Sequence, residues 1–284
     1  MSKTKETAVI VHSDMHYGRK TISYNPDVFV RRMKDLRDSI AKIKYLLNSE
    51  YDFDKLVIFQ LGDANDGTDI YKTQPHHQAI TNVEAQAYEL SQIYVDHLTD
   101  LGDIFPRIEI EAVPGNHGRA GRFAHEGANW DIVTYRYTQM QLANTNIFLH
   151  MNPIDNPFIR QVGIRGWNYL LYHGHEIKSW GGIPWYGILL RLARWGMTNK
   201  YGNTDVAVMG HFHSFGQWQF NKMLAMMSGT MVTDDDWALQ SLGWESTAKW
   251  WMFGVNDKRP ITWQYGLELA KSSDRADGLI IPNY

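Results

Sequence analysis

No cysteine occurs among the 284 residues of this sequence. Its absence excludes disulfide bonds and thiolate metal ligands, so a metal site would have to use His, Asp, Glu or Asn side chains. Positive charge in excess is also lacking, since the formal net charge is −3. Without an overall positive field, a polyanion would have to be held by a local basic patch or by bound cations.

Long apolar runs are absent as well. No segment reaches the roughly 18 residues of a membrane-spanning helix, and residues 1–7 show no signal-peptide pattern. We therefore expect a cytoplasmic protein.

The length and a hydrophobic content of 44% allow a sizeable core. Repeats, low-complexity tracts and linkers are missing, which favours a single domain over residues 1–284, with a β-rich part after about residue 214 that completes a second sheet.

Strand-like and helix-like segments alternate in the first half of the chain. Asn25-Pro26-Asp27 combines a cap, a proline and an acidic residue, which is typical of a helix start. The expected strands are residues 7–12, 56–61 and 108–113, and the expected helices are residues 26–48 and 80–101. The second half is richer in strands: we expect a hairpin over 158–172, a short strand over 205–209, and hairpins within 216–227 and 249–265.

Side chains that bind metals gather directly after the expected strands. They form five short strings: His12-Ser13-Asp14-Met15-His16, Gly62-Asp63-Ala64-Asn65-Asp66, Gly115-Asn116-His117, His173-Gly174-His175 and Gly210-His211-Phe212-His213. Groups past the carboxyl ends of strands meet at one edge of an α/β sheet. Their carboxylates, amide and imidazoles suffice to bind two adjacent divalent ions. Metal-dependent hydrolysis of phosphate esters uses such a pair of ions. Two such ions bring four positive charges and Asp14 and Asp63 remove two, so the site would still attract phosphate.

Taken in this order, the five strings resemble those of the calcineurin-like metallophosphoesterases over roughly residues 7–213. The resemblance implies an α/β fold, a four-layer αββα sandwich, and a binuclear metal centre. It implies a first metal held by Asp14, His16, Asp63 and His213, and a second held by Asp63, Asn116, His173 and His211. Asp63 would bridge the two ions. A hydroxide between the metals would attack phosphorus, and His117, oriented by Asp66, would protonate the leaving group.

Two glycines separate the sequence from one branch of that family. Gly67 and Gly118 stand where the phosphoprotein phosphatases carry an arginine and an acidic residue, so a protein phosphatase is disfavoured. The strings are more similar to the phosphodiesterase and nuclease branch, which includes repair exonucleases and phage-encoded relatives. For a phage-encoded chain the location would be the host cytoplasm.

The leading hypothesis is a phosphodiesterase or nuclease that acts on DNA or RNA. One alternative is a hydrolase of small nucleotides or phosphomonoesters, and another is an inactive interaction module, against which the complete ligand set argues. Mn²⁺ is the first choice of metal for His, Asp and Asn ligands, with Fe, Zn, Ni or Mg as alternatives.

Three residues near the strings are candidates for substrate binding. Arg119 and Arg122 lie in a glycine-rich loop after His117, where they either reach a substrate phosphate or belong to a solvated surface. His175 would face the same side as His173, where it is either an ordinary polar residue or one that supports the metals or contacts substrate.

Aromatic residues are abundant, and two groups of them could have either a structural or a binding role. Residues 180–197 could pack in the core, stack on single-stranded nucleic acid, lie on a membrane surface or form a homo-oligomer interface. Of the 11 tryptophans, five fall between Trp237 and Trp263 and are expected to fill a face of the second sheet.

Overall fold

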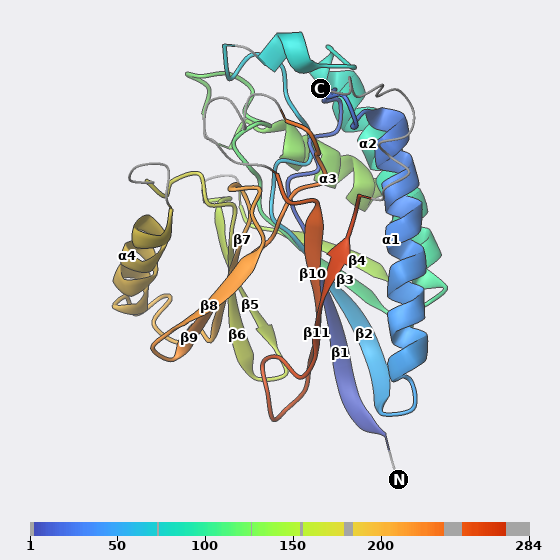
Figure 1. The fold of residues 1–284 in the computed structure, drawn as a ribbon, viewed down its shortest axis with the longest axis vertical. Coiled ribbons are helices and arrows are strands. Elements are labelled where there is room, and N and C mark those ends of the chain that lie inside the picture. The colour runs from blue at the N-terminus through green and yellow to red at the C-terminus, as the bar shows by residue number, and fades with distance from the viewer. Residues whose placement is uncertain are drawn as a thin grey trace, which may run out of the picture.

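Two β-sheets packed face to face form the centre of the computed structural model, which describes residues 3–72, 74–125, 127–153, 156–178, 184–235 and 246–270 (Figure 1). The first sheet contains β1 (Thr4–His12), β2 (Tyr51–Gln60), β3 (Ile108–Ala112), β4 (Ile147–Met151), β10 (Lys249–Val255) and β11 (Gln264–Glu268) in the order β11-β10-β1-β2-β3-β4. The second contains β5 (Ile159–Ile164), β6 (Trp167–Tyr172), β7 (Val206–Met209), β8 (Gly216–Phe220) and β9 (Met223–Met227) in the order β5-β6-β7-β9-β8.

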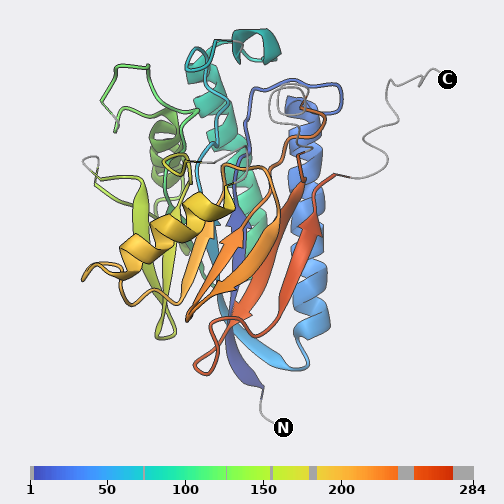
Figure 2. The same ribbon diagram turned by 60° about the vertical axis from the view of Figure 1, so that its left-hand side comes forward.

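Helices cover the outer face of each sheet (Figures 1 and 2). α1 (Pro26–Leu47), α2 (Val83–Gly102) and α3 (Trp130–Gln141) pack on the first sheet, and α4 (Trp185–Gly196) packs on the second. A short 3₁₀ helix, Gln74–His77, precedes α2. The layers are therefore helix, sheet, sheet and helix, which confirms the expected αββα sandwich. None of the described helices is long and apolar enough to cross a membrane.

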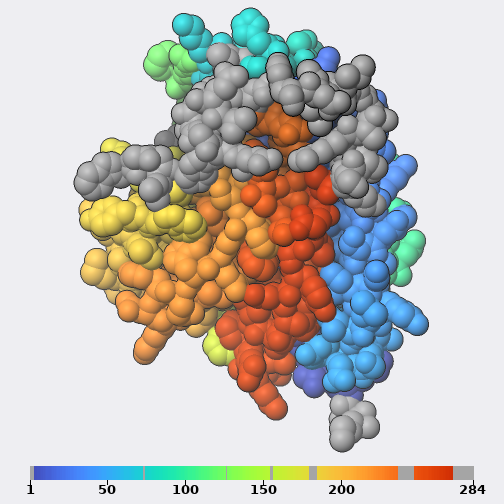
Figure 3. Space-filling model, in the orientation of Figure 1, coloured from blue at the N-terminus to red at the C-terminus, as the bar shows by residue number. Residues whose placement is uncertain are grey.

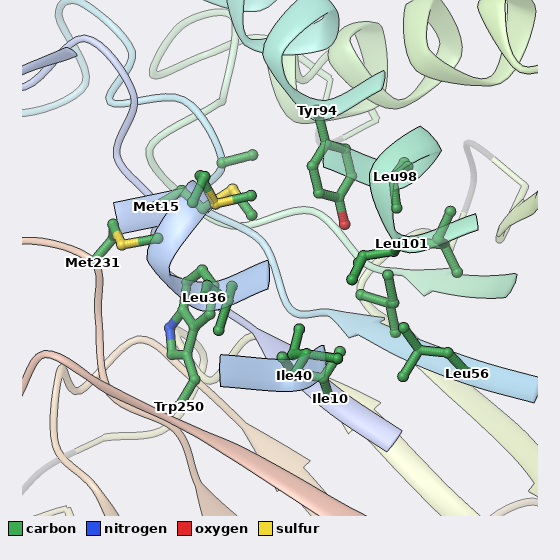
Figure 4. Packing of buried hydrophobic residues seen from close by; sticks show 14 of the residues in the cluster. Ile10, Met15, Leu36, Ile40, Leu56, Tyr94, Leu98, Leu101, Met231 and Trp250 are labelled. Atoms are coloured by element: carbon green, nitrogen blue, oxygen red, sulfur yellow. The ribbon is translucent and has the colours of Figure 1, made fainter. Parts of the chain in front are cut away.

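Successive side chains of the central strands point to opposite faces of the first sheet, and this divides the core into two layers. Ala8 and Ile10 of β1 face α1 and α2, whereas Val9 and Val11 face the second sheet. Both faces of this strand are buried, which explains its nearly continuous apolar sequence. Figure 4 shows the helix side of this core, where the aliphatic side chains of α1 and α2 meet the sheet around Trp250. Burial of each large aliphatic side chain contributes about 1.5–3 kcal/mol to folding.

The predicted helices begin where their caps allow. The side chain of Asn25 accepts a hydrogen bond from the Val28 amide, and α1 follows as expected. The second helix begins at Val83 rather than at residue 80, because the Asn82 side chain accepts hydrogen bonds from the amides of Glu84 and Ala85. The hairpin of β5 and β6 is confirmed, with a turn at Arg165 and Gly166 that both have positive φ.

One expectation about the C-terminal part is wrong. Among the described strands after residue 214, β8 and β9 join the second sheet, whereas β10 pairs antiparallel with β1 and extends the first sheet, followed by β11. Trp250 accordingly lies among the helices of the first sheet, and Trp251 lies between the two sheets on the Phe215 ring. Trp237 and Trp244 fall outside the described residues. Figure 3 shows the orange and red segments after residue 216 as one continuous surface beside the blue α1.

Candidate metal centre

The ligand-type residues occupy a single edge of the two sheets. β1, β2 and β3 run parallel to one another, as do β6 and β7, so their carboxyl ends meet at the same end of the molecule. The side chains that follow these ends are Asp14 and His16, Asp63, Asn116 and His117, His173, and finally His211 and His213. This arrangement brings together residues as far apart in sequence as Asp14 and His213, as the strand-end pattern of the sequence predicted.

The first group of side chains surrounds Asp14. The Nε2 atom of His213 lies 3.4 Å from Asp14 Oδ1, and the Nε2 atom of His16 lies 3.9 Å from the same oxygen. The two imidazole nitrogens are 3.0 Å apart. One nitrogen or oxygen atom of each of the three residues lies within 4.8 Å of the others, a spacing that fits one shared cation.

The second group surrounds His173. Its Nδ1 atom donates to the carbonyl oxygen of Leu61 at 2.7 Å, which leaves Nε2 to face the site. That nitrogen lies 3.0 Å from Asp63 Oδ2 and 2.8 Å from Asn116 Oδ1. His211 completes the group, since Asp63, His173 and His211 also place one ligand atom each within 4.8 Å.

Asp63 connects the two groups through one oxygen. Its Oδ1 atom accepts a hydrogen bond from the His117 amide at 2.8 Å. Its Oδ2 atom therefore turns inward, 3.0 Å from His173 Nε2 and 4.0 Å from His16 Nε2. A carboxylate held in this way presents negative charge to both groups at once.

The backbone at the site adopts unfavourable conformations. Five of the candidate ligands have positive φ, between 46° and 70°: Asp14, His16, Asp63, His211 and His213. Such left-handed conformations cost about 1–3 kcal/mol each at non-glycine residues and are concentrated at functional sites.

Two glycines permit the close approach of the turns. A Cβ atom at Gly115 would lie 2.1 Å from Asp63 Oδ1, and one at Gly210 would lie 2.4 Å from Asp14 Oδ2.

The donor set fits two divalent cations. The imidazole nitrogens of His16 and His213 face each other with carboxylates alongside, and His211 Nδ1 is buried without a hydrogen-bond partner among the described residues. Burial lowers the pKa of His173, but the Asp63 carboxylate outweighs that effect and raises the pKa to about 10. Bound cations would take the place of this proton, because histidine binds metals in its neutral form.

A buried ion network supports one side of the site, and Arg19 at its centre was missed from the sequence. The guanidinium donates to Asp66 Oδ1 at 3.2 Å and to both oxygens of Asp235 at 2.8 Å. Asp66 Oδ1 also lies 3.3 Å from His16 Nδ1. Although burial raises the pKa of Asp66, hydrogen bonds from His117 and His16 and the charge of Arg19 hold it well below the usual range.

His117 lies beside the metal ligands and against Asp66. Its Nδ1 atom is 3.1 Å from the Asp66 carbonyl oxygen and 3.6 Å from Asp66 Oδ1. Burial lowers the pKa of His117, yet Asp63 and Asp66 together leave it raised above the ordinary value. The residue also falls within ligand spacing of His16 and Asp63, so its role as an acid rather than a ligand remains a prediction.

The three predicted substrate residues lie at different distances from the ligands. Arg119 donates from Nε to the carbonyl oxygen of Asn116 at 2.9 Å, which places it at the second group. Arg122 donates to the Ile70 carbonyl oxygen at 3.0 Å, farther from the ligands along the same loop. The His175 ring centre is 5.7 Å from that of His173, and burial together with the charge of His173 lowers the pKa of His175 to about 3.

The aromatic segment of residues 180–197 contains α4, which has one buried and one exposed side. Ile188 and Leu192 of α4 are buried against the second sheet, whereas Trp185, Tyr186 and Leu190 remain exposed. The helix thus packs in the core on one side only. Residues 180–183 lie outside the described part of the chain.

Asp131, a buried carboxylate, is another residue near the site that the sequence did not reveal. It accepts hydrogen bonds from the amides of Asn65 at 3.0 Å and Gly115 at 2.9 Å, and so joins the turns after β2 and β3.

Substitution of Asp131 by Asn would set an NH₂ group against one of these amides. We expect a loss of about 1–3 kcal/mol in the free energy of unfolding. Urea unfolding in EDTA measures it, and Asp96→Asn on the exposed side of α2 is the control; equal stabilities would contradict this role.

Comparison with known proteins gives matches only among solved structures. No family profile and no curated protein matches the sequence. A predicted phosphoesterase from Streptococcus pneumoniae is 12% identical, with 94% of this chain and 99% of that one covered and a TM-score of 0.39. Vps29 from Entamoeba histolytica, solved with zinc, is 12% identical, with 93% and 99% covered and a TM-score of 0.42.

An archaeal phosphodiesterase is 11% identical, with 92% of this chain and 99% of that one covered and a TM-score of 0.40. Because these TM-scores are low, the fold described above rests on the sheets, layers and core of this chain itself.

Proposed function

We propose that this chain is a two-metal phosphoesterase whose substrates are phosphodiesters, with DNA or RNA as the expected class. The observation that carries the proposal is the Asp63 carboxylate, whose Oδ2 atom faces His16 on one side and His173 on the other. Asp14, His16, Asp63 and His213 would hold one ion, and Asp63, Asn116, His173 and His211 the other. When bound, the two ions would lower the pKa of water at the site and neutralise charge on the phosphoryl oxygens.

The charge at the site favours an anionic substrate. Among the proposed ligands only Asp14 and Asp63 carry negative charge, against four positive charges on two divalent ions, and the nearby Asp66 and Asp235 both flank the Arg19 guanidinium. The remaining charge is positive, although the protein as a whole is slightly acidic.

The chain's own residues would manage the proton of the leaving group. His117 Nδ1 faces Asp66, so the other ring nitrogen is left to donate to the leaving-group oxygen. Asp66 keeps the ring in this orientation because Arg19 holds the carboxylate in place. Mn²⁺ is the proposed metal, since imidazole, carboxylate and amide ligands suit it and no thiolate selects zinc.

Metal dependence and substrate class can be tested together. Protein stripped with EDTA should be inactive, and Mn²⁺ should restore cleavage of bis-p-nitrophenyl phosphate and of labelled oligonucleotides. The monoester p-nitrophenyl phosphate should remain largely intact. Cleavage of the monoester alone would favour the alternative, a hydrolase of small nucleotides or phosphomonoesters.

A further inference from the structure

The hydroxyl of Tyr71 stands between two side chains that can only donate to it. Asn116 donates from Nδ2 at 2.7 Å, and Arg119 Nη2 lies 3.5 Å away. Asn116 must turn its oxygen toward the second metal position to serve as a ligand, and Asn116 Oδ1 does lie 2.8 Å from His173 Nε2. Its NH₂ group is therefore the part that meets Tyr71.

This arrangement determines where the phenolic proton points. The NH₂ group of Asn116 and the guanidinium of Arg119 carry hydrogens but have no lone pair that could accept the phenolic proton. Both neighbours therefore use lone pairs of the Tyr71 oxygen, and within the described ranges no acceptor receives its hydrogen. The residue is 37% exposed, and its hydroxyl lies beside the second ligand group, 2.7 Å from Asn116 Nδ2.

Arg119 adds further donors at the same place. Its Nε atom is committed to the Asn116 carbonyl oxygen, and in the part of the chain that the structure describes no acceptor meets Nη1. We propose that Tyr71 and Arg119 form a subsite for a non-bridging phosphoryl oxygen, directly beside the second metal position. The inference rests on the proposed function and extends it by naming the groups that bind the phosphate.

The Tyr71 backbone is held firmly enough to make this a built subsite. Gln74 Oε1 accepts hydrogen bonds from the amides of Ile70 at 2.9 Å and Tyr71 at 3.1 Å. Arg122 donates to the Ile70 carbonyl oxygen, and the Tyr71 ring lies 5.0 Å from the ring of His117. Donors on a rigid segment bind an anion without an additional ordering cost.

Orthophosphate binding to the Mn²⁺-loaded protein tests the subsite by calorimetry. Tyr71→Phe keeps the ring and removes only the hydroxyl, and should weaken orthophosphate binding by about 10-fold or more. Arg119→Gln should weaken it in the same direction. Affinity for Mn²⁺ in Tyr71→Phe should fall by less than the affinity for orthophosphate, since Asn116 keeps its oxygen. Tyr88→Phe, at an exposed tyrosine of α2, is the matched control and should change neither affinity.

Three results would overturn the inference. One is unchanged orthophosphate affinity in Tyr71→Phe. Another is a loss of Mn²⁺ affinity that fully accounts for the loss of orthophosphate, because Tyr71 would then act only by orienting Asn116. The third is a wild-type protein that binds Mn²⁺ but no orthophosphate. Failure of the proposed function gives a different pattern: orthophosphate binds and depends on Tyr71, yet no ester is hydrolysed.

Discussion

Replacement of Asp63 by Asn is expected to abolish phosphodiester hydrolysis, with a loss on the order of 10³-fold or more, and to release bound metal. Asp63 Oδ1 accepts from the His117 amide and Oδ2 faces both ligand groups. An asparagine has one oxygen for these two positions. Its NH₂ group must oppose either the His117 amide or the cations, and the negative charge between the ions is lost in both cases.

Elemental analysis and bis-p-nitrophenyl phosphate turnover measure this outcome. The control is Asp69→Asn, an exposed carboxylate six residues further along that contacts only the Thr68 hydroxyl among the described residues. It removes the same charge from the same segment and should retain metal and activity. Full activity of Asp63→Asn would exclude a bridging role for this residue.

Replacement of His117 by Ala is expected to lower turnover by about 10²–10⁴-fold while both metals stay bound, since general acid catalysis contributes on that scale. The effect should depend on the leaving group. Nitrophenolate leaves without help from a proton, whereas the alkoxide of an oligonucleotide requires one, so oligonucleotide cleavage should suffer more.

The structure makes this a demanding test, because His117 lies within ligand spacing of His16 and Asp63. Metal content by elemental analysis separates the two roles. Loss of metal from His117→Ala would make the residue a ligand. His150→Ala, at an exposed histidine of β4, provides the control for removal of an imidazole.

Much of the fold follows from local sequence patterns. Asn25-Pro26-Asp27 predicted the start of α1, and the Arg165-Gly166 turn predicted the hairpin of β5 and β6. The pairing of β10 with β1 was not predicted, because an apolar strand does not encode which sheet it joins. α3 and β4 were also missed; in α3 three of the five buried residues are polar, namely Asp131, Thr134 and Thr138, so its apolar stripe is weak.

The candidate site was predicted where strands end in ligand-type residues. All seven predicted metal ligands lie at one edge of the sheets. Arg19, Asp131 and Tyr71 were not found, because each is defined by its partners in space rather than by its neighbours in sequence. Arg19 meets Asp235 across 216 positions, a contact that no local pattern announces.

Titration of Mn²⁺ into EDTA-stripped wild-type protein, followed by calorimetry and by diester hydrolysis in the same samples, tests whether this chain is a two-metal phosphodiesterase. We expect two Mn²⁺ ions to bind per chain, with hydrolysis appearing as the second site fills. A chain that binds no Mn²⁺, gains no thermal stability from it and cleaves no ester would exclude that function and favour the inactive interaction module.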